Sequence, residues 1–179
     1  MGTIKIDELP HYTYEDYLLW QGDWELINGI PYAMTPAPTV EHQRISQRIA
    51  ACLGEALEEC NRCHALLPVD WKISEDTVLQ PDNLVVCYEP KGTHIVRAPS
   101  LIFEILSRSS AHKDQKTKYE LYEQEGVNYY VMVDPTDRVA KIYGLVSGKY
   151  KKLIDTEDEI VTFDLESCSI ELDFARIFK

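Results

Sequence analysis

Three charged residues between positions 80 and 122 have types and spacing that could do chemistry together. Asp82 follows a proline at the start of an apolar segment, and Glu104 stands alone inside the apolar run 101–106. An isolated carboxylate in a buried strand is costly unless it is paired or binds a cation. Lys118 lies in the helix-like segment that follows. Two carboxylates on neighbouring strands with a lysine close by are what a magnesium-dependent phosphodiester site needs.

Each of these residues also has a purely structural interpretation. Asp82 could be a turn residue at the start of a strand, and Lys118 could be a solvated helix lysine paired with an acidic residue four positions away. A buried ion pair with Arg44 or Arg48 would account for Glu104. We favour a function for Asp82 and Glu104, because a lone charge in an apolar run is otherwise hard to explain.

Turn signals and periodicity predict the elements that must position these residues. Asn28-Gly29 between two apolar runs is a strong signal for a two-residue hairpin, and Thr39 is a plausible N-cap of a long helix. In order, we expect a short helix (12–20), a hairpin (23–27 and 30–34), a helix (39–59), three strands (67–73, 78–87 and 101–106), a helix (111–125), a strand (129–133), a hairpin (139–145 and 150–154), an acidic segment and a terminal turn (174–178). This order predicts one α/β domain over residues 1–179 with a mixed sheet.

The charge of the chain is unevenly distributed. The formal net charge is −12, which argues against a tight DNA-binding protein, since affinity for phosphates comes largely from Lys and Arg. Residues 155–173 contain eight acidic residues and no basic one, whereas the stretch 108–118 carries four basic residues against one aspartate. A local phosphate site therefore remains compatible with the overall charge.

The ordered set of elements and motifs resembles the PD-(D/E)xK nuclease superfamily, and within it the Uma-type family of restriction endonuclease-like proteins, long catalogued only as a domain of unknown function. The resemblance spans residues 12–178. It rests on these pieces, in order: Trp24 to Gly29, His42, Gln80-Pro81-Asp82, Glu104 to Ser107, Asp114 with Lys118 and Tyr122, Gly126-Val127, and Asp134-Pro135. It implies a restriction endonuclease-like core (αβββαβ), extended by the N-terminal hairpin and by C-terminal β-structure.

One position departs from the superfamily pattern. The strand of Glu104 normally carries a lysine two residues later, and here that residue is Leu106. The resemblance implies that the lysine has moved to the following helix, where Lys118 fits best and Lys116 is the second choice. A catalytic role therefore requires that one of these two ammonium groups reaches the carboxylates.

The resemblance also implies the chemistry of the site. Asp82, Glu104 and the backbone carbonyl of Ile105 would bind Mg²⁺ or Mn²⁺, and the reaction would be hydrolysis of phosphodiester bonds in DNA. Nucleases of this fold often pair so that two sites address two strands, which makes a homodimer one arrangement that the resemblance offers. Glu25 and His42 could complete the site, although a charged hairpin face and a core histidine are equally good interpretations of those two. The alternative function is a catalytically inactive nuclease-fold protein that acts as a binding or regulatory module.

The five cysteines do not suggest a disulfide framework. Their number is odd, and we expect a cytoplasmic chain, because residues 1–12 lack a secretory signal pattern and the apolar runs are too short to cross a membrane. Residues 60–64 match the haem-attachment pattern Cys-x-x-Cys-His, but that attachment normally requires export. A zinc site would need two further ligands, of which Cys52 is the obvious one. We therefore expect free thiols.

Overall fold

A computed structural model of the chain describes residues 9–34, 36–107 and 113–179, with the backbone alone described at 113 and 114. Two sheets, a separate hairpin and four helices make up this part of the chain. The elements are α1 (Tyr14–Tyr17), β1 (Trp24–Ile27), β2 (Ile30–Ala33), α2 (Val40–Ala56), β3 (His64–Leu66), β4 (Trp71–Ser74), β5 (Thr77–Leu79), β6 (Asn83–Val86), β7 (Leu101–Ile105), α3 (Lys113–Glu125), β8 (Tyr129–Asp134), β9 (Val139–Val146), β10 (Lys149–Thr156), β11 (Ile160–Asp164), β12 (Ser169–Asp173) and α4 (Phe174–Ile177). Among the helices of these ranges, none is long and apolar enough to cross a membrane.

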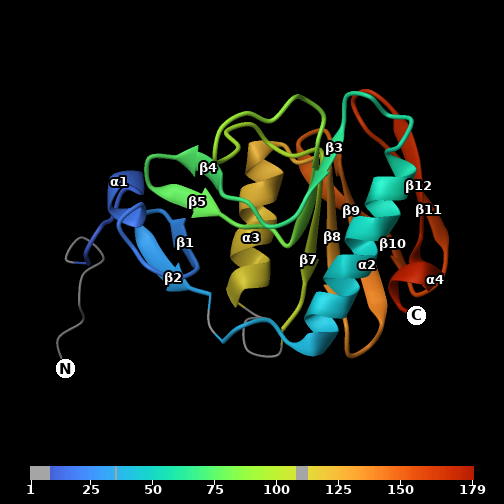
Figure 1. Cartoon of the computed structure of the whole chain (residues 1–179), viewed down its shortest axis with the longest axis horizontal. Coiled ribbons are helices and arrows are strands. Elements are labelled where there is room, and N and C mark those ends of the chain that lie inside the picture. The colour runs from blue at the N-terminus through green and yellow to red at the C-terminus, as the bar shows by residue number, and fades with distance from the viewer. Residues whose placement is uncertain (1–8, 35, 108–112) are drawn as a thin grey trace.

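The larger sheet forms the centre of the molecule. Its strand order is β10-β9-β8-β7-β6-β3, and β7 and β8 are parallel while their neighbours pair antiparallel. The helix α3 makes the crossover that joins the two parallel strands, which such a connection requires. One core lies under α2, α4 and the β11–β12 hairpin, and a second lies on the opposite face under α3, as Figure 1 shows. The predicted mixed sheet is therefore present.

The smaller sheet has the strand order β2-β1-β5-β4 and lies on the α3 side of the molecule (Figure 1). Its first hairpin turns at Asn28 and Gly29, whose φ angles of 49° and 75° are those of a type I′ turn. Ile27 pairs with Ile30 in the register that a two-residue loop sets. The hairpin prediction is confirmed.

The predicted strand 78–87 is wrong in one important respect. The chain breaks at Gln80-Pro81-Asp82, so that β5 belongs to the smaller sheet and β6 to the larger one. Pro81 has no N–H to donate to a ladder, which explains the break inside an otherwise apolar run. Asp82 consequently lies at the junction of the two sheets.

The predicted strand 67–73 also needs correction. The strand β4 begins only at Trp71, after Pro68, and the short strand β3 just before it was not predicted. The three-residue β3 forms the edge of the larger sheet through its pairing with β6.

The helix boundaries follow the capping residues. The side chain of Thr39 accepts a hydrogen bond from the backbone N–H of His42 at 3.2 Å, as predicted for the N-cap of α2. Gly126, with a φ of 82°, ends α3, and the predicted turn after β8 is closed by Asp134, whose carboxylate accepts backbone N–H groups from Thr136 and Asp137.

The acidic segment 155–173 is more ordered than its composition predicts. It forms the β11–β12 hairpin, in which Phe163, Ile170 and Leu172 are buried and the alternate residues are mostly exposed. The acidic residues therefore make a solvated face on a hairpin that packs on the α2 side of the core.

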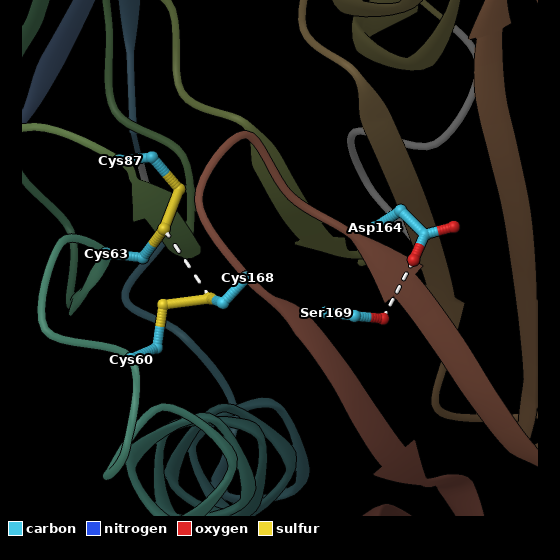
Figure 2. Close-up of a disulfide and its surroundings, with 6 residues drawn as sticks. All are labelled: Cys60, Cys63, Cys87, Asp164, Cys168 and Ser169. Atoms are coloured by element: carbon cyan, nitrogen blue, oxygen red, sulfur yellow. Dashed lines mark hydrogen bonds between the residues drawn. A yellow bond between two sulfur atoms is a disulfide. The ribbon is translucent and has the colours of Figure 1, made fainter.

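The prediction of free thiols is wrong for four of the five cysteines. Cys60 is bonded to Cys168, and Cys63 to Cys87 (Figure 2), while Cys52 is free and buried. The partners are 108 and 24 residues apart, so only the tertiary fold brings them together. Cys60 and Cys63, the two cysteines of the haem-attachment pattern, are thus both in disulfides, and these disulfides account for the pattern without haem.

We expect the substitution Gly29→Ala to destabilise the protein more than Gly148→Ala. Both glycines have a φ of 75° in a hairpin turn, so alanine costs about 1–2 kcal/mol at either position. A Cβ atom at Gly29 would also lie 2.3 Å from the His11 ring, whereas Gly148 faces open space. Denaturant unfolding of both variants measures the difference, and equal losses would contradict this account of the first hairpin.

Candidate active site

The ammonium group of Lys118 lies between two buried carboxylates. Its Nζ is 2.8 Å from Oε1 of Glu25 and 3.0 Å from Oε1 of Glu104, and all three side chains are about nine-tenths buried or more. Glu25 comes from β1, Glu104 from β7 and Lys118 from α3. The cluster therefore joins the two sheets and the crossover helix at one point.

Two neutral groups hold the carboxylates of this cluster in place. The Tyr122 hydroxyl donates to Oε1 of Glu104 at 2.5 Å, and the backbone N–H of Gln80 donates to Oε1 of Glu25 at 2.8 Å. Tyr122 is one helical turn beyond Lys118, a spacing visible in the sequence although its role was not. Nothing in the sequence marks the contact of Gln80, because it depends on the break between β5 and β6.

Asp82 lies beside Glu104 at the same end of the larger sheet. Its Oδ2 accepts the backbone N–H of Ile105 at 2.8 Å, and the Nε2 atom of His42 is 3.2 Å away. His42 Nδ1 is the buried side-chain polar atom that has no hydrogen-bond partner within the described ranges. A buried hydrogen bond of 3.0 Å between Ser46 and Asn83 fixes the start of α2 against β6.

The structure thus brings together all five side chains that the sequence indicated. Of the two candidate lysines, Lys118 is in the cluster, whereas the Lys116 side chain is 81% exposed and 3.9 Å from Glu120. Leu106 occupies the usual lysine position and is half-buried in the apolar core below α3. Glu104 pairs with Lys118 and not with an arginine of α2, and the suggested pairing of Lys118 with Asp114 lies outside the described side chains.

The pKa values show how charge is distributed in the cluster. Burial is the largest effect on the pKa of Glu104 and raises it. The charge of Lys118 lowers this pKa, the charges of Asp82 and Glu25 raise it, and the result is a pKa of about 7. Burial acts to lower the pKa of Lys118, but the charges of Glu104 and Glu25 outweigh it and hold that pKa well above its ordinary value. The pKa of His42 is raised as well, because the hydrogen bond and charge of Asp82 exceed the opposing effect of burial. Lys118 therefore stays protonated at neutral pH.

These residues line an open cleft with a volume of about 1050 Å³. Its walls come from the β1–β2 hairpin, the start of α2, the ends of β6 and β7, and α3. Glu25, His42, Asp82, Glu104 and Lys118 all contribute to its surface. The carboxylates are thus accessible from solvent although each is largely buried.

The donor set fits a hard divalent cation. Three carboxylates converge here against one lysine. Burial is the largest cause of the raised pKa of Glu104, and the charges of Asp82 and Glu25 add to it. Carboxylate oxygens are the ligands that Mg²⁺ and Mn²⁺ prefer, and a cation would relieve this repulsion. Asp82 and Glu104 are the residues best placed to hold it.

The mixed sheet, its crossover helix and the similarity to a solved structure place the chain in the class of restriction endonuclease-like folds. The chain is similar to a crystal structure described as a putative nuclease belonging to DUF820 from Anabaena variabilis ATCC 29413, with a TM-score of 0.76 and 17% identity over 93% of this chain and 97% of that one. No curated protein matches the chain. The Uma2 family, described as putative restriction endonuclease, matches residues 14–174, and the chain belongs to it. The predicted family and fold are confirmed.

The raised pKa of Glu104 gives the protein a distinct pH dependence in the absence of metal. Between the ordinary value of 4.5 and about 7, the folded state binds more protons than the unfolded state, so the free energy of unfolding falls as pH rises through this window. We expect Glu104→Gln to remove this part of the pH dependence in denaturant unfolding.

The control for this experiment is Glu120→Gln, which makes the same change at an exposed glutamate of α3, outside the buried cluster. It should keep the wild-type slope of stability against pH. An unchanged slope in Glu104→Gln would show that the carboxyl of Glu104 is not protonated preferentially in the folded state.

Proposed function

We propose that the protein is a metal-dependent endonuclease that hydrolyses phosphodiester bonds in DNA. The single observation that carries the proposal is the position of Lys118, whose ammonium lies against Glu104 and Glu25 in an open cleft although the usual lysine position is Leu106. The family description supports nuclease activity, while the metal, the DNA substrate, homodimer formation and the cytoplasmic location remain proposals.

Asp82 and Glu104 would bind the metal, with the Ile105 carbonyl as the further ligand that the resemblance implies. Bound Mg²⁺ or Mn²⁺ would supply a water of lowered pKa and neutralise charge on the phosphate. The chain itself fixes one ligand before any metal arrives, because Ile105 N–H and His42 both hold Oδ2 of Asp82. Such preorganisation is what a metal site needs for its first ligands.

Lys118 acts as a positive charge and not as a general base in this proposal. Its raised pKa keeps the ammonium protonated, so it has no lone pair with which to accept a proton at neutral pH. A fixed cation beside the carboxylates can orient the attacking water and stabilise the negative charge that develops on the phosphate.

The alternative is a nuclease-fold protein that binds a partner without cleaving DNA. Two observations favour it: the net charge of −12, and the engagement of Oε1 of Glu104 by both Lys118 and Tyr122. In this case the buried cluster would serve the stability of the junction between the sheets.

A cleavage assay on plasmid, linear single-stranded DNA and RNA, with Mg²⁺ or Mn²⁺, distinguishes the two functions. We expect Asp82→Asn and Lys118→Met to lose about 10²-fold or more of the rate, because each removes a group that acts on the reacting phosphate or its metal. Lys116→Met, which changes an exposed lysine two residues away, should retain wild-type activity.

Circular dichroism of each variant would separate loss of chemistry from loss of fold, since Lys118→Met leaves two buried carboxylates without their cation. Cleavage that persists in chelator, or that Asp82→Asn leaves unchanged, would contradict the proposed site. Absence of cleavage by the wild type on all three substrates would favour the non-catalytic alternative.

A further inference from the structure

Four cysteines from distant parts of the chain meet at one place, away from the acidic cleft. Cys60 follows α2, Cys63 precedes β3, Cys87 follows β6, and Cys168 lies in the turn between β11 and β12. Figure 2 shows the two disulfides side by side, with Sγ of Cys63 at 3.9 Å from Sγ of Cys168. The Sγ atoms of Cys60, Cys63 and Cys168 all lie within 4.8 Å of one another.

This arrangement matches what a structural zinc site requires. Structural zinc sites use four cysteine or histidine ligands, among them sets of four thiolates. They often begin with two cysteines separated by two residues, as Cys60 and Cys63 are. With Zn–S bonds of about 2.3 Å, the sulfurs of a tetrahedral site are about 3.8 Å apart. The Sγ atoms of Cys63 and Cys168, which belong to different disulfides, are 3.9 Å apart. This distance is close to that between two sulfur ligands of a tetrahedral zinc site.

The backbone presents Cys63 and Cys87 directly opposite each other. Because His64 pairs with Val86 in the antiparallel β3–β6 ladder, these two cysteines form the next facing pair. Their Cα atoms are 3.9 Å apart, closer than the range of about 4.4–6.8 Å usual for a disulfide. The sheet therefore holds two sulfur ligands side by side whether or not they are bonded to each other.

The surroundings would protect a metal ion from solvent. Cys63 is 4% exposed, and the other three cysteines pack partly buried against the core that α2 and the C-terminal hairpin share. From the sequence, a zinc site lacked two ligands beyond Cys60 and Cys63; the fold supplies Cys87 and Cys168. Cys60, Cys63 and Cys168 form the close group of sulfurs, and Cys87 is joined to it by its disulfide with Cys63. Cys52, the candidate nearest in sequence, is buried and forms no disulfide.

We propose that the reduced protein binds one Zn²⁺ through the thiolates of Cys60, Cys63, Cys87 and Cys168, and that the two disulfides are the oxidised form of the same site. A dithiol reductant supplies two electrons and two protons to each disulfide and is itself oxidised to a disulfide. The four thiols then lose their four protons as the sulfurs bond to the metal. In the oxidised form the Cys60–Cys168 disulfide fastens the β11–β12 turn to the end of α2. In the reduced form the metal would join this turn to the β3–β6 edge of the larger sheet as well.

The test uses the full chain, reduced by dithiothreitol without oxygen and transferred to metal-free buffer. Zn²⁺ is titrated against a chromophoric chelator, and native mass spectrometry gives the stoichiometry. Co²⁺ serves as a spectroscopic probe, because tetrahedral thiolate coordination produces intense visible bands and sulfur-to-metal charge transfer. We expect one thiolate-bound metal per reduced chain, with the visible and charge-transfer bands of the cobalt form. The oxidised protein should show no such bands.

Matched variants locate the metal. Cys168→Ala should weaken zinc binding by more than the roughly 10–100-fold typical for loss of a group that merely supports a ligand, because it removes one of the four ligands. Cys52→Ala should leave zinc binding unchanged. Asp82→Asn should also leave it unchanged, which separates this site from the acidic cleft. Equal losses in Cys52→Ala and Cys168→Ala would overturn the proposal. Absence of the cobalt–thiolate bands in the reduced wild type would overturn it too, however the variants fold.

Discussion

The ion pairs of Lys118 with Glu25 and Glu104 are the interaction on which the rest of the structure depends. Three buried charges on β1, β7 and α3 can coexist only if each is paired, because an unpaired one would cost several kcal/mol. The pairing therefore fixes the smaller sheet and the crossover helix against the larger sheet. It also leaves the cluster with more negative than positive charge, since Asp82 adds a third carboxylate beside Ile105.

The sequence allowed the central part of this site to be predicted, because burial of charge is a local and costly feature. Glu104 inside an apolar strand required a partner or a metal, and the family resemblance offered Lys118, with Lys116 as second choice, on the following helix. The hairpin at Asn28-Gly29 was equally clear, since its turn needs two residues that accept positive φ. For Glu25, a site role and a place on a charged hairpin face were equally good interpretations of the sequence, because the position of a hairpin relative to a distant sheet is not a local property.

Three other features could not be predicted because they depend on contacts between distant parts of the chain: the break at Pro81, the β11–β12 hairpin and the disulfides. The apolar run 78–87 gives no sign that Pro81 divides it between two sheets, although that division places Asp82 at the cleft. The acidic segment 155–173 conceals the apolar alternation of β11 and β12 beneath a high density of charge. The pairing of Cys168 with Cys60 joins residues 108 positions apart, a contact that only the folded hairpin creates.

The proposed metal-dependent activity requires that the three carboxylates of the cleft hold a divalent cation. Calorimetric titration of the wild type with Mn²⁺ at several pH values tests this, with Glu104→Gln and the exposed-site variant Glu120→Gln alongside. Because metal must displace the proton from a carboxyl with a pKa of about 7, affinity should rise between about pH 6 and about pH 8, with proton release. Glu104→Gln should abolish the binding and Glu120→Gln should not. Binding that is independent of pH, or unaffected by Glu104→Gln, would contradict the account.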